Sequence, residues 1–266
     1  MKRAGFAAIV FLALVTLASL LAEVLAPASY AQQFRDAPDA ACSRQHPLGT
    51  DDLGRDRFSR LLYGTRVSLL LAPAAALLSC TVAGLVGGTA GFAGGWVEEF
   101  VMSATDLFLS LPWLFLLITV RALLPLNVAP LTSVVITFAL LGSLGWAGAA
   151  RVVCADTRRL CDSDFMLQAR ASGSAGPRLL FRHLLPNLKP VLLAQFWISI
   201  PVFILSETNL SMLGLGVTEP LPSWGSLLRE LESYSVLSAR PWQFVPLILL
   251  VATVSCFHVA MQREES

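Results

Sequence analysis

Long apolar runs alternate with short polar segments along this chain of 266 residues. A helix of about 20 apolar residues is enough to cross the hydrocarbon core of a bilayer. The pattern therefore predicts an all-α, polytopic membrane protein with six transmembrane helices. The six runs are residues 4–22, 67–97, 107–120, 131–150, 190–213 and 241–262. The third of these, residues 107–120, is the core of a span that we expect to begin at Met102 to Asp106.

The first apolar run has two interpretations. It follows Lys2 and Arg3, and Ser29-Tyr30-Ala31 downstream has the small-x-small pattern of a signal-peptidase site. The run is longer than the usual apolar region of a signal peptide, and it suffices for one bilayer crossing. We therefore favour an uncleaved transmembrane helix over a cleaved signal peptide.

Glycines and prolines mark special points within and between the predicted spans. Small residues on one helix face allow close helix packing in lipid, and a proline inside a span can kink it. In the second span, glycines recur at three- to four-residue spacing and end in a turn; they are Gly84, Gly87, Gly88, Gly91, Gly94 and Gly95. Pro112 lies inside the third span, and Pro125, Asn127 and Pro130 mark the turn before the fourth.

The polar segments divide the chain into three regions. Residues 1–26 form the N-terminal helix, and residues 27–66 form a compact external loop with an interfacial helix that begins at Arg57. Residues 67–262 form a five-helix core with a cytoplasmic loop at 151–188 and an external loop at 214–242.

Loop charges set the expected orientation. Lys2, Arg3 and the arginines of 151–188 place both termini and that loop in the cytoplasm by the positive-inside rule. The six arginines of 27–66 oppose this assignment, because acidic residues contribute little to the rule. We keep the assignment because strong spans bound residues 151–188 on both sides, and the number of spans then fixes the remaining loops.

Composition agrees with a membrane protein. Apolar residues make up 55% of the chain and charged residues 14%, whereas a soluble domain carries about a quarter charged residues. The net charge of +1 gives no information about partners. The five cysteines lack metal-like or CxxC spacing and are expected to be small apolar packing residues.

Motifs for hydrolytic chemistry are missing. Lys2 and Lys189 are the only lysines, and neither belongs to a GxxxxGK[ST] loop, so ATP-driven work must come from another chain. His46, His183 and His258 are too scattered for an HExxH motif. We expect no catalytic site, no metal and no cofactor. An intramembrane enzyme would need a nucleophile–base pair that the sequence does not offer.

Ionisable residues beside or inside the spans are candidate functional groups. A charge at mid-bilayer costs about 3 kcal/mol, so such side chains should face protein, water or an interface. Asp106 and Arg121 lie near span ends and fit packing roles, whereas Glu207 lies deeper and fits packing or a pathway equally well. A stand-alone proton-coupled carrier that uses Glu207 and Asp106 is therefore a functional alternative.

The polar stretch from Asp164 to Asn187 is the largest polar surface between two spans. We predict a helix from Asp156 to Ala171, a glycine elbow, and a second helix from Pro177 to Leu185. Gly173 suits the elbow because glycine reaches φ > 0 without strain.

Docking to another protein is the predicted role of this stretch. Arg178 and Arg182 share one helix face. Phe181, Leu184 and Leu185 are expected on another face, before a stop at Leu185-Pro186-Asn187.

Three motifs resemble one known family. HPLGTDDLGRDRFSRLLYGTRVSL (46–69) resembles a G-T-D-x-x-G-R-D signature. QARASG (168–173) through HLLPN (183–187) resembles E-A-A-R-x-x-G…H-x-L-P-N. ETNLSMLGLG (207–216) followed by PSWG (222–225) resembles L-S-F-L-G-L-G…P-S-W-G. In this order they are similar to the permease subunits of binding-protein-dependent ABC importers, in the dipeptide, oligopeptide and nickel group.

The resemblance implies a type I ABC importer permease fold in a bacterial cytoplasmic (inner) membrane, with periplasmic outer loops. It implies pairing with a second homologous permease and two cytoplasmic ATPase subunits that grip the coupling loops. A periplasmic or lipid-anchored solute-binding protein would deliver the solute. Peptides are the first expectation for that solute, and nickel or another small solute is the alternative. Membrane lipid is a further expected partner, and nucleic acid is not.

The resemblance also assigns the coupling residues. Ala169, Arg170 and Gly173 would transmit force, and His183, Pro186 and Asn187 would fix the return into the fifth span. The chain departs from the family pattern at Leu167 and Gln168, which replace the glutamate and first alanine of the motif. It also departs at Ser103, where the family tends to carry an arginine, and in the short tail 262–266. The predicted ATPase-coupling residues are Leu167, Gln168, Ala169, Arg170, Gly173, His183, Pro186 and Asn187.

Overall fold

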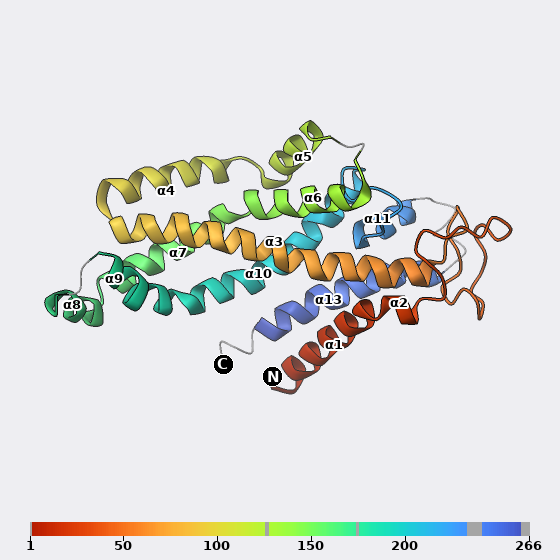
Figure 1. Cartoon of the computed structure of the whole chain (residues 1–266), viewed down its shortest axis with the longest axis horizontal. Coiled ribbons are helices and arrows are strands. Elements are labelled where there is room, and N and C mark those ends of the chain that lie inside the picture. Colours follow the sequence, from red (N-terminus) through yellow and green to blue (C-terminus); the bar gives the residue numbers. More distant parts are fainter. Residues whose placement is uncertain (1, 126–127, 174–175, 233–240, 262–266) are drawn as a thin grey trace. The chain divides into compact units, whose positions relative to one another are not determined.

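The computed structural model describes residues 2–125, 128–173, 176–232 and 241–261 (Figure 1). Within these ranges the regular elements are helices, and two isolated β-bridges, Gln33–Arg55 and Thr50–Asp56, connect parts of the loop 27–66. The first half contains α1 (Lys2–Leu20), α2 (Ala22–Leu25), α3 (Arg57–Ala93), α4 (Gly95–Ser110), α5 (Trp113–Leu123), α6 (Pro130–Leu144) and α7 (Trp146–Cys161). The second half contains α8 (Asp164–Ala171), α9 (Pro177–Leu179), η1 (Leu180–Leu184), α10 (Leu185–Met212), α11 (Trp224–Arg229), η2 (Glu230–Glu232), η3 (Pro241–Phe244) and α13 (Val245–Met261).

The apolar helices are roughly consistent with the six predicted spans. In the described part of the chain, four helical segments are long and apolar enough to cross a membrane: Arg57–Ala93, Pro130–Cys161, Leu180–Met212 and Pro241–Met261. The pair α4 and α5 adds a fifth if the two helices form one broken span, and α1 contains the shorter apolar segment Ala4–Leu20. The predicted all-α membrane fold is confirmed.

The third span is bent more strongly than a kinked helix. Helices α4 and α5 meet at 82° across a break of a few residues that contains Pro112. A proline inside a helix removes a backbone donor and clashes with the preceding turn. The prediction that Pro112 interrupts this span is therefore confirmed, with a sharper result than expected.

The interfacial helix predicted at Arg57 is not a separate element. Helix α3 begins at Arg57 and continues to Ala93 through Pro73, which lies inside it. Its polar first turns stay helical because their charges are paired: Arg57 with Glu230 and Arg60 with Glu219. The sequence showed these arginines but not their distant partners.

Two predicted boundaries around loop 151–188 were wrong. The helix expected over residues 156–171 is divided, because α7 ends at Cys161 and α8 begins at Asp164. The expected stop at Leu185-Pro186-Asn187 is absent, since η1 is a π-helical turn that leads directly into α10. A π turn changes the backbone spacing, and the helix then continues past Pro186.

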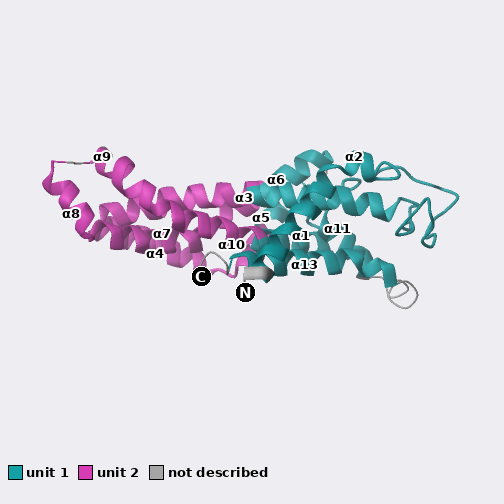
Figure 2. Cartoon of the chain, turned by 90° about the horizontal axis from the view of Figure 1, so that it is seen from below, with its two compact units in different colours: residues 1–73, 120–138, 201–266 teal, residues 74–119, 139–200 magenta. Residues whose placement is uncertain are grey.

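The chain divides into two compact units (Figure 2). Unit 1 comprises Met1–Pro73, Val120–Phe138 and Pro201–Ser266, and unit 2 comprises Ala74–Thr119 and Ala139–Ile200. In unit 1, α1 packs along α13. In unit 2, α4 packs against α7, and α8 and α9 lie at one end of the unit (Figure 2).

Glycines bring α3 close to α7 within unit 2. A Cβ atom added at Gly87 would lie 2.2 Å from the carbonyl oxygen of Ala150, and one added at Gly91 would lie 2.6 Å from that of Cys154. These distances confirm that small residues permit a close helix approach here. The expected turn is also present, because Gly94 has a φ of 66° at the start of α4.

Three sequence predictions concern residues outside the described ranges. They are the Asn127 part of the turn before the fourth span, residues 233–240 of the external loop 214–242, and the tail 262–266.

Candidate functional site

The candidate coupling loop lies between α7 and α10 in unit 2. Helix α8 is followed by Gly173 and Gly176, whose φ values are 81° and 48°. Such left-handed backbone favours glycine because it has no Cβ atom. The predicted glycine elbow, with φ > 0 at Gly173, is therefore confirmed.

This loop has an apolar core of its own. Met166 and Ala169, one turn apart on α8, are buried against Leu179 and Leu184. Cys161 and Leu188 complete the cluster, and partly buried side chains pack around it: Phe92, Leu160, Leu180 and Leu192. The loop is therefore folded back on the ends of its neighbouring helices. Sequence reasoning missed Met166, although its spacing of three from Ala169 was a usable signal.

Other predicted coupling residues form the exposed side of α8. Leu167 is 52% exposed, and Gln168 and Arg170 are exposed beside it. Ala169 points instead into the core of the loop. Gly173 is exposed and has open space around the position of a Cβ atom. Of the coupling residues predicted between Leu167 and Gly173, only Ala169 is buried, and the others are exposed.

The apolar face predicted for the second helix was wrong. Phe181 is 65% exposed and Leu185 is 45% exposed, whereas Leu184 is fully buried. The three residues do not share one environment because η1 has π-helical rather than α-helical spacing.

The return into α10 is held by a side-chain bond. Asn187 Nδ2 donates a hydrogen bond to the carbonyl oxygen of His183 at 2.6 Å. In the same turn, Leu185 N donates to the carbonyl of Leu180, and Pro186 has no N–H to donate. His183, Pro186 and Asn187 are therefore neighbours in one irregular turn, and both Pro186 and Asn187 are exposed.

Charges at this end of unit 2 fall into two groups. Within the described residues, the arginines of α7 are paired: Arg151 with Asp106 at 3.2 Å, Arg158 with Glu98 at 3.1 Å and Arg159 with Asp156 at 3.3 Å. Arg170, Arg178 and Arg182, which follow α7, take part in none of these pairs. Asp106 on α4 is thus an ion-pair partner of Arg151. Ser103, on the same helix, is exposed.

Glu207 occupies a different site, in unit 1. It is completely buried, and its Oε1 atom accepts hydrogen bonds from Ser211 at 2.6 Å and from Ser223 at 2.7 Å. Ser223 is the N-cap of α11, and its own hydroxyl accepts from Ser226 N. The carboxylate therefore ties the end of α10 to the start of α11, and it joins the two halves of the third motif.

The first and third motifs meet in unit 1. Trp224 is fully buried, and its indole Nε1 donates to Thr65 Oγ1 at 2.8 Å. At Gly64, an added Cβ atom would lie 3.3 Å from both Leu227 and Ser223. The start of α3 therefore packs directly on α11.

A buried charge cluster completes this junction. Asp51, Arg55 and Arg60 are buried, and Arg55 Nε bonds to Asp51 Oδ2 at 2.6 Å. Both arginines also bond to Glu219, and the Arg60–Glu219 distance is 2.9 Å. Burial disfavours the charge of Glu219, but the guanidinium groups of Arg60 and Arg55 outweigh this effect and hold its pKa below the ordinary value.

This charge cluster was missed at the sequence level. The visible signal was the alternation of acids and arginines between Asp51 and Arg60, which predicted a compact loop. Glu219 and Glu230, however, lie far along the chain. Arg55, Arg57 and Arg60 are therefore paired with acids, although this pairing does not change how they count in the positive-inside rule.

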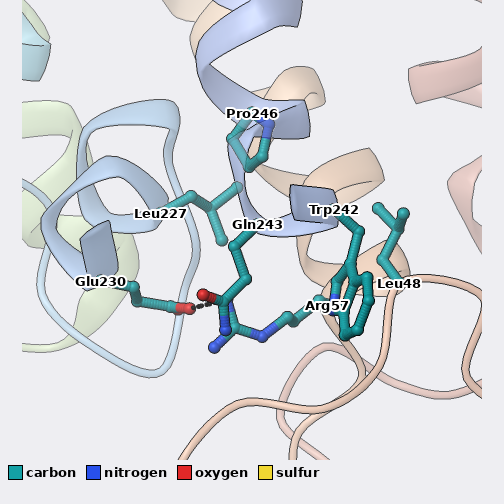
Figure 3. Close-up of a pocket in the computed structure, with 7 residues that line it drawn as sticks. All are labelled: Leu48, Arg57, Leu227, Glu230, Trp242, Gln243 and Pro246. Atoms are coloured by element: carbon teal, nitrogen blue, oxygen red, sulfur yellow. Dashed lines mark ion pairs between the residues drawn. The ribbon is translucent and has the colours of Figure 1, made fainter. Parts of the chain in front are cut away.

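A small pocket of about 10 Å³ lies beside this cluster (Figure 3). Arg57 and Glu230 face one another across it, with a 3.0 Å ion pair, and Gln243 lies next to them (Figure 3). Burial raises the pKa of Glu230 to about 7, although Arg57 and Arg60 oppose the shift. The remaining lining residues are Leu48, Leu227, Trp242 and Pro246.

Arg121 is also fully buried in unit 1. Its Nη2 atom donates to Ser133 Oγ at 3.1 Å, and its Nη1 atom lies 3.4 Å from the carbonyl of Pro125. Thr218 Oγ1 donates to the same Ser133 oxygen at 2.8 Å. Arg121 therefore links α5, α6 and the loop before α11. Among the described residues, no group of three or more His, Cys, Asp or Glu side chains is arranged to hold a metal ion.

Comparison with known proteins identifies the chain at the family level. Residues 81–263 match the family described as "binding-protein-dependent transport system inner membrane component". The oligopeptide transport system permease protein OppC of Bacillus subtilis is 31% identical over 252 residues, which cover 94% of this chain and 80% of the relative. OppC of Escherichia coli is 32% identical over 262 residues, which cover 97% of this chain and 83% of the relative. A putative peptide permease protein of Brucella suis is 34% identical over 209 residues, which cover 79% of this chain and 67% of the relative. With the membrane-spanning helices and the three motifs, these matches show that the chain belongs to the inner membrane permease family of binding-protein-dependent ABC importers.

Proposed function

We propose that this ABC importer permease carries dipeptides or oligopeptides. The support is similarity over most of the chain to permeases named for oligopeptide and peptide transport. Nickel or another small solute is the alternative cargo, because the motifs also resemble nickel permeases. Uptake of a labelled peptide by a strain carrying only this transporter, with unlabelled peptide and nickel as competitors, separates the two.

We infer that the exposed face of α8, within loop 151–188, is the contact with cytoplasmic ATPase subunits. The observation that carries this inference is the fixed, outward face of α8: Leu167, Gln168 and Arg170 are exposed, while Met166 and Ala169 anchor the helix from behind. A rigid, anchored helix can transmit a push, whereas a mobile loop would absorb it. The sequence has no phosphate-binding loop, so ATP hydrolysis is assigned to the partners.

Two further partners are part of the proposal. A second permease would complete the translocation pathway, and a periplasmic or lipid-anchored binding protein would dock on the external loops. Lys2, Arg3 and the arginines of 151–188 support a cytoplasmic location for that loop and for both termini, which leaves residues 27–66 on the outer side. Packing of α1 along α13 supports retention of the first helix in the mature protein.

The coupling role is tested with two loop variants and one matched control. Arg170→Glu and Gly173→Pro are expected to abolish substrate-stimulated ATPase activity of the assembled transporter, with membrane insertion unchanged. Arg159→Glu makes the same charge change outside α8 and is expected to retain stimulation. Full stimulation in both loop variants, or failure of the tagged chain to co-purify any ATPase, would contradict the proposal.

A further inference from the structure

An apolar groove of about 560 Å³ lies within unit 2, and none of its described lining residues belongs to α8. One wall comes from α3, through Leu77, Cys80 and Thr81. The other wall comes from the start of α10, through Leu185, Pro186, Lys189, Leu192, Leu193 and Phe196.

Lys189 is the only charged residue among those that line the groove. It is exposed, and within the described ranges it takes part in none of the ion pairs of unit 2. It nevertheless belongs to the membrane-spanning segment Leu180–Met212. A lysine in such a segment is costly unless its ammonium reaches an interface or an anion.

The groove is polarised along its length. Lys189 lies near the η1 end of α10, and Phe196 lies about 10 Å further along the helix at 1.5 Å per residue. A cation at one end and apolar walls beyond it match the two parts of an anionic phospholipid. Basic sites between transmembrane helices on the cytoplasmic side are suited to such head groups.

We propose that this groove binds one anionic phospholipid, with the phosphate at Lys189 and an acyl chain between α3 and α10. The absence of any acid among the lining residues favours an anionic occupant. A helix of another permease would bury Lys189 without a partner unless it supplied its own carboxylate, and an unpaired buried charge is strongly destabilising. The lipid supplies both the anion and the apolar surface.

The test uses the purified full-length chain in nanodiscs of phosphatidylcholine with a minor fraction of phosphatidylglycerol. Native mass spectrometry then measures which lipid remains bound after release. The wild type is expected to retain phosphatidylglycerol selectively. Lys189→Gln is expected to lower that selectivity about fivefold, because this is the effect of removing one contact between a cation and an anionic lipid. Lys189→Arg should retain it, and Thr81→Phe should lower retention of the lipid by filling the groove.

Arg178→Gln is the matched control, because it removes one exposed cation of the same unit that does not line the groove. Equal selectivity in the wild type and Lys189→Gln would overturn the proposal. Loss of the bound lipid when the chain is co-assembled with a second permease would also overturn it, because the groove would then be a protein interface. Selective retention in both the isolated and the assembled chain, lost in Lys189→Gln and kept in Arg178→Gln, supports it.

Discussion

Glu230 shows how one side chain can make the junction of the first and third motifs sensitive to pH. Its carboxylate is largely buried beside Arg57 and Arg60, and this burial raises its pKa to about 7. Asp51 lies close enough to reinforce the shift, while Arg55 opposes it. An acid whose pKa is higher in the folded state binds its proton more tightly there than in the unfolded state. Its stabilising contribution is therefore complete below the unfolded pKa of about 4.5 and is lost as the pH rises to about 7.

Glu230→Gln is expected to remove this pH dependence. The wild-type unfolding midpoint in detergent should fall relative to that of the variant as the pH rises from about 4.5 to about 7, and the difference should level off above this range. The measurement is a thermal unfolding series across that window. Glu219→Gln is a useful comparison, because the pKa of Glu219 is lowered and its contribution should instead be lost on acidification. A flat difference curve for Glu230→Gln would contradict the assignment of its pKa.

Adjacent glycines on α3 provide a matched pair for helix packing. A Cβ atom at Gly87 would lie 2.2 Å from a backbone oxygen of α7, whereas one at Gly88 meets nothing within 4 Å. Gly87→Ala is expected to destabilise the protein by about 1–3 kcal/mol, because the helices must separate. Gly88→Ala should be neutral or slightly stabilising, since alanine is the better helix former. Chemical denaturation in detergent distinguishes them, and equal effects would show that the close approach is not required.

At the scale of elements, Glu207 connects α10 to α11 through side-chain hydrogen bonds. Its Oε1 atom accepts from two buried serine hydroxyls, Ser211 and Ser223. Glu207→Ala leaves both donors without this acceptor and is expected to cost about 2–3 kcal/mol. Glu207→Gln keeps an acceptor oxygen and should cost less. Limited proteolysis after Gly214 should report faster cleavage in Glu207→Ala, and unchanged cleavage would remove the carboxylate from this structural role.

The element boundaries that sequence reasoning placed wrongly share a physical cause. The helix predicted to begin at Arg57 is continuous with the second span, and its first turns are held because Arg57 and Arg60 are paired with acids more than 150 residues away. The helix predicted over residues 177–185 merges with α10 because a π turn precedes Pro186. Neither effect can be predicted from the helix propensities of the local residues. The first is a tertiary contact, and the second is a change of helical spacing. The elbow at Gly173, by contrast, depends on one residue and was predictable.

At the scale of the whole molecule, the sequence predicted the membrane spans and the family but not the arrangement of its motifs. Span prediction succeeds because bilayer crossing depends mainly on local apolar length. The first and third motifs pack together in unit 1, whereas the second lies in unit 2, in the loop that we propose as the coupling element. Glu207 is buried in the motif junction of unit 1, whereas Asp106 of unit 2 is an exposed ion-pair partner of Arg151.

The coupling surface can be tested without disturbing the rest of the molecule. Leu167 and Gln168 stand where the family motif has glutamate and alanine, and both are exposed on α8. Changing both, Leu167→Glu with Gln168→Ala, is expected to leave the thermal midpoint unchanged, because neither residue belongs to the core of the loop. In the proposed contact with the transporter's own ATPase, the new carboxylate adds a charge to the exposed face of α8. Stimulated hydrolysis is therefore expected to fall about tenfold, which corresponds to a cost of roughly 1.4 kcal/mol. Met166→Ala is the opposite control, since it truncates a fully buried side chain and should lower the midpoint. If the double variant couples as well as the wild type, the outward face of α8 does not set partner recognition, and the contact must lie elsewhere on the loop.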